Sequence, residues 1–236
     1  MSGAIKTALI TGGTKGIGLG VAHILTKAGI RVCITGRNDD TVRNAAAHLN
    51  SLVPDSAIGV QSDVRDYDSQ VKAVNEVIKQ WGRLDYFIAN AGVGHFANIE
   101  QLTPEQWHET IDINLTGVFY SAKASLEALK KTQGMFISIA SLAGTNFFAA
   151  GSAYNASKFG LVGFTQAMML DVRDHGVRVS TIMPGSVSTY FNDHIPSDAD
   201  AWKIQPEDIG QLVLDLIEMP ARTLPSKIEV RPSRTK

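Results

Sequence analysis

Short apolar runs alternate with longer stretches of helical periodicity along almost the whole chain. Several runs are apolar at successive positions, which is typical of parallel strands covered by helices on both faces. The alternation predicts an α/β fold with a doubly wound parallel β-sheet of about seven strands. The runs predicted as strands are Thr7–Ile10, Val32–Thr35, Ala57–Gln61, Leu84–Ala89, Met135–Ile139, Arg178–Met183 and Lys227–Val230.

The stretches between these runs are expected to be helices that flank the sheet. The expected helices are Gly18–Ala28, Asp40–Leu52, Asp68–Trp81, Pro104–Asn114 continuing to about Lys130, Tyr154–His175 and Pro206–Glu218. The 236 residues contain no internal repeat, low-complexity tract or linker rich in Pro, Gly and Ser. We therefore predict a single domain over residues 1–236.

The least regular stretch is residues 186–205, between the last two expected helices. Long irregular segments in compact domains usually carry function. This one contains Tyr190, Phe191 and Trp202, and its aromatic content favours a lid over a binding site rather than a plain surface loop.

Charge and composition argue against several functional classes. The formal net charge is −1 and acids and bases are interspersed, which does not favour a nucleic-acid partner. The single cysteine, Cys33, lies in an apolar run and is expected in the core. Neither a signal peptide nor a stretch long enough to span a membrane is recognisable. We expect a soluble, cytoplasmic protein with no membrane partner, and we assign no metal ligands.

A glycine-rich loop, Thr11-Gly-Gly-Thr-Lys-Gly-Ile-Gly18, directly follows the first predicted strand. Its glycines would allow a tight turn, close approach of a pyrophosphate and close packing of helix on strand. The following helix would offer free N–H groups to phosphates. This context predicts a Rossmann-like dinucleotide site. The residues assigned to it are Gly12, Thr14, Lys15, Gly16, Ile17 and Gly18.

The end of the second predicted strand indicates which dinucleotide binds. Proteins that use NAD normally place an acid about 20 residues beyond the glycine loop, where it holds the ribose 2′-hydroxyl. Here the segment reads Thr35-Gly-Arg-Asn38, with no acid before Asp39. Arg37 can bind a 2′-phosphate bidentately, and Lys15 adds a second positive charge. The prediction is NADP(H), with NAD(H) less favoured.

Ser141, Tyr154 and Lys158 form a pattern suited to carbonyl chemistry. A tyrosine and a lysine at i and i+4 share one face of a helix. The ammonium is expected to lower the pKa of the phenol, and the serine hydroxyl could hydrogen-bond a carbonyl oxygen. Tyr-x-x-x-Lys alone would arise by chance in about one shuffled sequence in four, so an ordinary amphipathic helix is the alternative.

Other motifs make the assignment specific. Asp63-Val64, Asn90-Ala91-Gly92, Asn114 and Pro184-Gly185-x-Val187-x-Thr189 accompany the glycine loop and the Ser–Tyr–Lys pattern, in order. With these motifs the chain resembles the short-chain dehydrogenase/reductase family from Thr7 to about Ile209. It is similar to 3-oxoacyl-[acyl-carrier-protein] reductases and to small carbonyl reductases of that family.

The resemblance implies a role in cofactor binding for several residues. Asp63 would hydrogen-bond the adenine with Val64 packed beside it, and Asn90, Ala91 and Gly92 would line the adenosine ribose. Pro184, Gly185, Val187 and Thr189 would seat the nicotinamide carboxamide.

The resemblance also implies the catalytic roles. Asn114 would hold a water near Lys158 and complete a proton relay. Ser141 would orient the carbonyl, Tyr154 would act as the acid, and Lys158 would also bind the nicotinamide ribose. Ser138 lies near the same strand end, but the family's spacing to the tyrosine selects Ser141.

The implied activity is NADP(H)-dependent reduction of a ketone or aldehyde to an alcohol, or the reverse. The residues expected to face the substrate are Val93, Gly94, His95, Phe96, Asn146, Phe147, Phe148, Tyr190 and Phe191. A 3-oxoacyl thioester on acyl carrier protein, with Lys130 and Lys131 near the mouth, and a small free carbonyl compound are both compatible. The natural substrate and direction stay open.

Two further implications concern assembly and an alternative function. Family members commonly form homodimers and homotetramers through helices that correspond to residues 114–130 and 154–173. The tail Arg231–Lys236 departs from the family's usual ending, which puts the tetramer contact in doubt. The alternative function is an NADP(H)-binding sensor without turnover, although such proteins tend to lose the tyrosine or the lysine.

Overall fold

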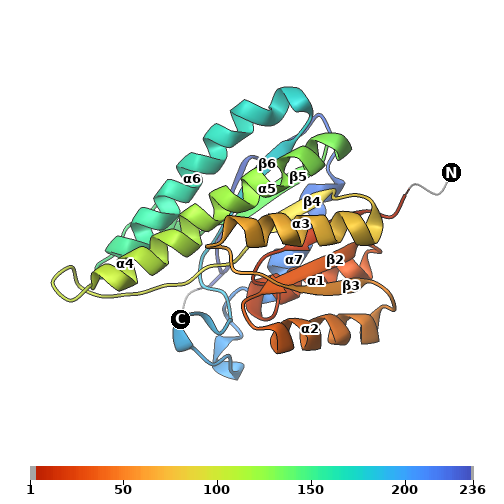
Figure 1. Ribbon diagram of the computed structural model, residues 1–236. Coiled ribbons are helices and arrows are strands. Elements are labelled where there is room, and N and C mark those ends of the chain that lie inside the picture. The colour runs from red at the N-terminus through yellow and green to blue at the C-terminus, as the bar shows by residue number, and fades with distance from the viewer. Residues whose placement is uncertain (1–3, 235–236) are drawn as a thin grey trace.

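A parallel β-sheet forms the centre of the protein in the computed structural model, which describes residues 4–234 (Figure 1). Its seven strands are β1 (Thr7–Ile10), β2 (Arg31–Gly36), β3 (Ala57–Gln61), β4 (Tyr86–Ala89), β5 (Met135–Ile139), β6 (Arg178–Pro184) and β7 (Lys227–Val230). Their order is β3-β2-β1-β4-β5-β6-β7. The chain therefore winds outward from β1 in both directions, which confirms the doubly wound α/β fold.

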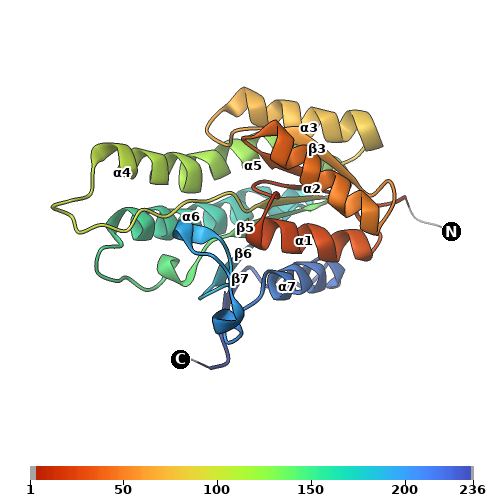
Figure 2. The ribbon, with the colours of Figure 1, turned by 90° about the horizontal axis from the view of Figure 1, so that it is seen from below.

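Helices cover both faces of this sheet (Figures 1 and 2). They are α1 (Gly16–Lys27), α2 (Asp39–Leu52), α3 (Tyr67–Trp81), α4 (Pro104–Ile111), α5 (Gly117–Thr132), α6 (Ser152–Val172) and α7 (Pro206–Glu218). Successive residues of a strand point to opposite faces. Accordingly, Ile10 packs with α1, α2 and α7, whereas Leu9 and Cys33 pack with α3, α5 and α6. Cys33 is a buried core residue, as expected.

The expected continuous helix from Pro104 is interrupted. A π-helical turn, Asp112–Thr116, separates α4 from α5 and contains Asn114. The Asn114 side chain accepts a hydrogen bond from the Val93 amide and donates one to the Val93 carbonyl oxygen, and these two bonds hold this turn. Single π-helical turns often occur at functional sites, and periodicity alone does not reveal them.

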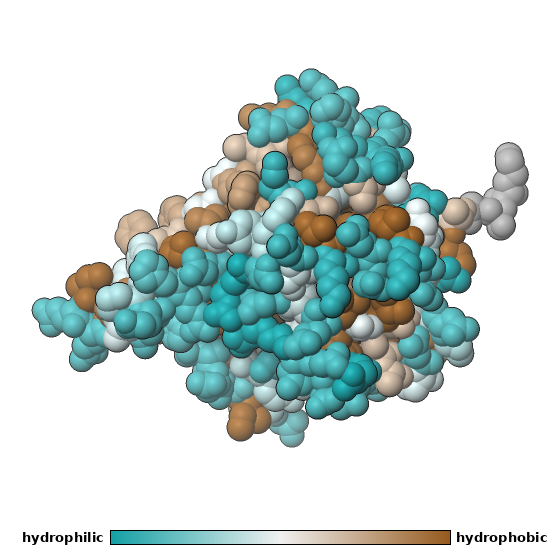
Figure 3. Space-filling view, in the orientation of Figure 1, coloured by the Kyte–Doolittle hydropathy of each residue, from teal (hydrophilic) through white to brown (hydrophobic). Residues whose placement is uncertain are grey.

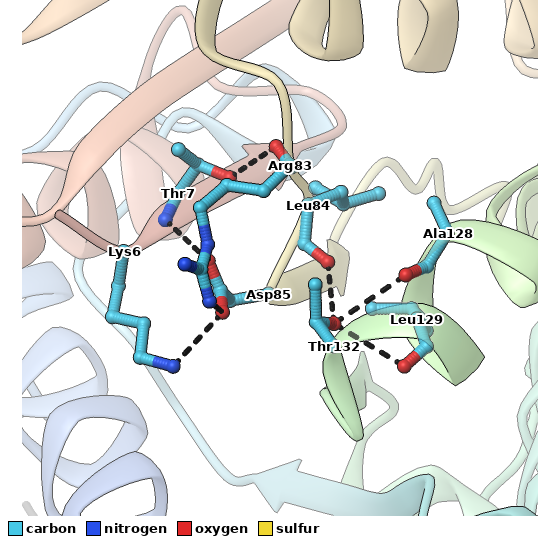
Figure 4. A network of polar contacts seen from close by, with 8 residues as sticks. All are labelled: Lys6, Thr7, Arg83, Leu84, Asp85, Ala128, Leu129 and Thr132. Carbon is cyan, nitrogen blue, oxygen red and sulfur yellow. Dashed lines mark hydrogen bonds and ion pairs between the residues drawn. The ribbon is translucent and has the colours of Figure 1, made fainter. Parts of the chain in front are cut away.

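A buried carboxylate anchors the amino edge of the sheet (Figure 4). Asp85, just before β4, accepts hydrogen bonds from the Lys6 ammonium at 3.1 Å, the Thr7 amide at 3.0 Å and the Arg83 guanidinium at 2.6 Å. Burial opposes its ionisation, but the hydrogen bonds from Arg83, Thr7 and Lys6 outweigh burial and lower the pKa of Asp85. The carboxylate thus ties the start of β1 to the start of β4.

Hydrophilic side chains dominate the face in Figure 3, and the apolar patches on it are scattered. Within residues 4–234, none of the helices is both long and apolar enough to cross a membrane.

Candidate active site

A cavity of about 810 Å³ opens where the carboxyl ends of β1, β2, β4, β5 and β6 meet. Ligands of doubly wound sheets bind at this edge, beside the point where the strand order reverses. Of the residues assigned to the cofactor from the sequence, all but Gly18 line the cavity, and so does Ser141.

The glycine loop has the backbone shape that its sequence predicts. Gly12 and Gly16 have φ values of +64° and +56°, which L side chains rarely adopt. A Cβ at Gly18 would lie 2.4 Å from the Gly12 carbonyl oxygen, so Gly18 supports the loop from behind. The side chain of Asn90 donates to the carbonyl oxygens of Thr11 and Gly12 and braces the loop from β4.

The amino terminus of α1 is suited to an anion. Its N-cap residue, Lys15, makes no capping hydrogen bond with its side chain, and the first turn contains no acid. The first N–H groups of the helix therefore face the cavity without a side-chain acceptor, as a phosphate site requires. This loop and helix end fit the pyrophosphate of a dinucleotide.

Arg37 and Asp63 border the other end of the cavity. The Arg37 side chain is 61% exposed, and its one ion pair within residues 4–234 is a 4.0 Å contact with Glu109. An exposed pair of that length contributes little, which leaves the guanidinium available to a ligand. Asp63 is bound by Arg65, whose hydrogen bonds lower the pKa of Asp63.

Ser141, Tyr154 and Lys158 converge in the wall of the cavity. Ser141 follows β5 and accepts a hydrogen bond from the Ala143 amide at 3.1 Å, which fixes the turn Leu142–Gly144. The Lys158 ammonium lies 5.6 Å from the centre of the Tyr154 ring and donates to the Ile139 carbonyl oxygen at 3.2 Å. Ser138, by contrast, is fully buried within β5.

The electrostatics of the pair differ from the expectation. Burial raises the pKa of Tyr154, and hydrogen bonding with Ser141 opposes the rise without cancelling it. Burial lowers the pKa of Lys158 to about 8. The sequence predicted a lowered tyrosine pKa, but the desolvated cavity disfavours both charged forms. Lys158 therefore remains mostly protonated at pH 7, beside a neutral phenol.

Asn114 lies behind the cavity wall rather than in it. Its fully buried side chain donates to the Val93 carbonyl oxygen at 2.8 Å and to the Ser157 hydroxyl at 3.0 Å, and accepts from the Val93 amide at 2.9 Å. These contacts tie the segment after β4 to α6. The relay role of Asn114 remains a prediction.

Aromatic rings enclose Tyr154 on the substrate side. The rings of Phe96 and Phe191 lie 5.3 Å and 5.6 Å from the Tyr154 ring, and Phe148 packs on Phe96 at 5.7 Å. Asn146, Phe147 and Phe148 were also expected to face the substrate, but none of them lines the cavity, and Phe147 is 85% exposed. Apolar rings therefore pack against the ring of Tyr154, while His95, His194 and Lys203 add polar groups elsewhere in the cavity lining.

One residue that borders the substrate loop was missed from the sequence. Glu109 accepts a hydrogen bond from the His95 ring at 2.8 Å and also faces Arg37. Glu109 lies within a helical stretch and belongs to no recognisable motif, so only the tertiary structure reveals that it connects the two ends of the cavity.

Residues 186–205 contain two short 3₁₀ turns, Phe191–Asp193 and Asp198–Asp200, of which only the first lines the cavity. Asp200 is buried and accepts from the Lys203 ammonium at 2.6 Å and pairs with the His194 ring at 2.5 Å. Hydrogen bonds from Lys203 and His194 lower the pKa of Asp200. This ionic contact fixes the shape of the segment.

Comparison with known families decides the assignment. The model of the short chain dehydrogenase family matches residues 6–200. The chain belongs to this family. A curated short-chain dehydrogenase relative, trans-4-hydroxycyclohexanecarboxylate dehydrogenase of Sinomonas cyclohexanicum, is 34% identical over 225 residues, which cover 90% of this chain and 86% of the relative. The protein is therefore an oxidoreductase that acts on CH–OH or C=O groups.

Solved structures of similar short-chain dehydrogenases share the fold over nearly their full length. An alcohol dehydrogenase from the archaeon Thermococcus sibiricus, complexed with 5-hydroxy-NADP, superposes with a TM-score of 0.93 at 27% identity and covers 98% of both chains. A 3-ketoacyl-ACP reductase from Sinorhizobium meliloti 1021 gives a TM-score of 0.87 at 30% identity, covering 96% of this chain and 97% of that one.

Proposed function

We propose that this short-chain dehydrogenase uses NADP(H) to reduce a ketone or aldehyde to an alcohol, or to catalyse the reverse reaction, with Tyr154 as general acid/base. The observation that carries the proposal is the convergence of Ser141, Tyr154 and Lys158 in the cavity that also contains the glycine loop. When bound, NADPH supplies the hydride.

The protein's own residues bind and protonate the carbonyl oxygen of the substrate. The Ser141 hydroxyl donates to the carbonyl oxygen and stabilises the charge that develops there. Tyr154 transfers its phenolic proton to that oxygen, so that no free alkoxide forms. The Lys158 ammonium stabilises the phenolate that remains, because an opposite charge nearby favours the charged form. The apolar rings of Phe96 and Phe191 exclude water from this exchange.

The assignment of NADP(H) rests on how the residues of the cavity match the parts of this cofactor. The uncapped start of α1 suits the pyrophosphate, Arg37 suits a 2′-phosphate, and Asp63 suits the adenine. The archaeal alcohol dehydrogenase with the same fold was solved with an NADP derivative, which supports the choice. We also propose that residues 186–205 form the lid of this site, because Thr189 lies against Gly16 and Lys15 lies over the Tyr190 ring.

Replacing Arg37 by alanine should lower the preference for NADPH over NADH, measured as the ratio of the two kcat/KM values. Loss of a charge-assisted contact with the 2′-phosphate predicts a fall of about 10- to 100-fold in that ratio. The control is Arg43→Ala, because Arg43 is exposed on α2 and pairs only with Asp39 and Asp40. A wild-type enzyme that prefers NADH would contradict the assignment.

The substrate that fits best is a free, largely apolar carbonyl compound. The aromatic rings around Tyr154 favour it. The lysines expected to face an acidic carrier protein, Lys130 and Lys131, lie at the end of α5 just before β5 begins. They are thus at the amino edge of the sheet, opposite Ser141.

A substrate panel tests the function. We expect NADPH oxidation with cyclic and aromatic ketones, and NADP⁺ reduction with secondary alcohols that include trans-4-hydroxycyclohexanecarboxylate. If the protein turned over only 3-oxoacyl carrier protein, the substrate would be the carrier-bound thioester and not a free ketone. If the protein bound NADP(H) but turned over no compound of the panel, the alternative function of an NADP(H)-binding sensor would be favoured.

We further propose that the protein is a homodimer or homotetramer. Phe119 on α5 and Phe159 and Leu170 on α6 are apolar yet 43–54% exposed. Exposed apolar side chains gathered on two adjacent helices are typical of an interface. Analytical ultracentrifugation would decide the state.

A further inference from the structure

Asn155, on the first turn of α6, is 8% exposed and uses its whole side-chain amide. Its Nδ2 donates to the carbonyl oxygens of Ala143 and Asn146, each at 2.8 Å. Its Oδ1 accepts from the Phe148 amide at 3.3 Å. All three partners are backbone groups of the loop 142–150, so one side chain holds that loop at three points.

The loop 142–150 connects two parts of the proposed site. At its start, the Ser141 side chain accepts from Ala143 and the Ser141 carbonyl accepts from Gly144 at 2.9 Å. Near its end, the Phe148 ring packs on Phe96, which packs edge-on against the ring of Tyr154. Displacing the loop would therefore move the serine hydroxyl and the aromatic wall together.

The loop is shaped to receive the amide. Ala150 has a φ of +62°, which is unusual for a residue other than glycine. A Cβ at Gly151 would lie 2.6 Å from Asn155 Oδ1 and 2.6 Å from a ring carbon of Phe148. The absence of a side chain at residue 151 is what lets the asparagine and the loop meet.

We propose that Asn155 is a positioning residue that fixes Ser141 and the Phe148 ring relative to Tyr154, and thereby sets both the rate of carbonyl reduction and the bulk of the substrate accepted. The inference rests on the reductase function proposed above. Asn155 and Tyr154 are neighbours on the same helix. The hydrogen bonds of Asn155 therefore fix the position of the loop relative to Tyr154. An aspartate could not replace it, since a carboxylate cannot donate to the two carbonyl oxygens.

The test compares Asn155→Ala and Asn155→Asp with a matched control, Asn50→Ala. Asn50 makes the same kind of contacts, donating to the Ala57 carbonyl oxygen at 2.9 Å and accepting from the Ser56 and Ala57 amides at 3.0 Å and 2.9 Å. These contacts precede β3, at the opposite edge of the sheet. Asn50 is half-buried, so the control measures what losing such an amide away from the site does to stability alone.

We expect kcat to fall about 10²-fold in both Asn155 variants, because misplacement of a reacting group by about 1 Å has that effect. The Kd for NADPH should stay near the wild-type value, and KM should change more for bulky ketones than for small ones. In Asn50→Ala, kcat should be unchanged. A loss of kcat in the Asn155 variants no larger than in the control would overturn the proposal.

Two readouts separate positioning from general damage. If Asn155 acts through Ser141, kcat of Ser141→Ala/Asn155→Ala should be close to that of Ser141→Ala, since effects through one group are not additive. Hydrogen bonding with Ser141 opposes the raised pKa of Tyr154, so in alcohol oxidation the pH dependence of kcat should move to higher pH in the Asn155 variants. The proposal would be contradicted if the losses of kcat in the double variant were additive and the pH dependence of kcat did not move.

Hydrogen exchange provides a readout that needs no turnover. Amides of residues 142–150 should exchange faster in Asn155→Ala than in the wild type, and those of the glycine loop should not. Unchanged exchange in this loop would reject the positioning role whatever the activity. A wild-type protein that reduces no carbonyl compound would instead reject the proposed function, so the two failures are distinguishable.

Discussion

Replacing Tyr154 by phenylalanine should reduce kcat for carbonyl reduction by about 10²- to 10⁴-fold, the contribution typical of a positioned general acid. The change removes one oxygen atom and keeps the ring that packs against Phe96 and Phe191. The aromatic wall should therefore persist while the proton donor is lost. Turnover is measured as NADPH oxidation with the best ketone of the panel.

Cofactor affinity separates this effect from damage to the site. The glycine loop and Arg37 make no contact with the Tyr154 hydroxyl among the hydrogen bonds of the described residues, so the Kd for NADPH should change little. Tyr67→Phe is the matched control, because Tyr67 is half-exposed at the start of α3, packs on the ring of Tyr120 and does not line the cavity. Its kcat should stay within the same order as the wild type. Wild-type kcat in Tyr154→Phe would exclude the tyrosine as the acid.

The sequence predicted the sheet well because its inner strands are buried on both faces and therefore largely apolar, while the edge strand β7 alternates polar and apolar residues. β1, β3, β5 and β7 have the predicted bounds. β4 begins at Tyr86 rather than Leu84, because hydrophobicity marks burial and not ladder pairing: Leu84 is fully buried but precedes the strand. Helix bounds differ by a few residues for the same reason.

Local motifs also predicted which residues border the cavity. Most of the assigned cofactor residues lie at the end of a strand or in the turn that follows it, and the carboxyl ends of parallel strands share one edge, whereas Lys158 reaches this edge from α6. Gly18 and Asn114 are the exceptions, since both support the wall from behind. A sequence motif predicts that a residue lies at this edge of the sheet, but it does not predict whether the side chain lines the cavity or supports its wall.

What the sequence could not predict depends on contacts between distant segments. The raised pKa of Tyr154 follows from desolvation, which the Tyr-x-x-x-Lys spacing does not contain. The contacts of Glu109 with Arg37 and His95, and those of Asn155 with loop 142–150, bring together residues whose separation has no period or motif. Such contacts are found only from the fold.

Replacing Lys158 by methionine should abolish activity and weaken NADPH binding, yet stabilise the cofactor-free protein at pH 7. Lys158 is 4% exposed, and burial lowers its pKa from 10.5 to about 8. That difference corresponds to about 3 kcal/mol of unfolding free energy lost by keeping the ammonium in the cavity. Methionine has a similar length and no charge, so most of this free energy should be regained. Urea denaturation at pH 7 measures the change.

The sign of the pH dependence is the stricter test. The cost of Lys158 is fully present below pH 8, where the folded state holds the proton. Between about pH 8 and 10.5 the unfolded state binds more protons than the folded state, so wild-type stability should rise with pH. The advantage of Lys158→Met should shrink over that range, whereas Lys72→Met, at an exposed position of α3, should show no such trend. A methionine variant less stable than wild type at pH 7 would mean that the ammonium's bond to Ile139 outweighs its desolvation. In the proposed mechanism Lys158 is kept despite this cost, because the phenolate left on Tyr154 needs a cation beside it.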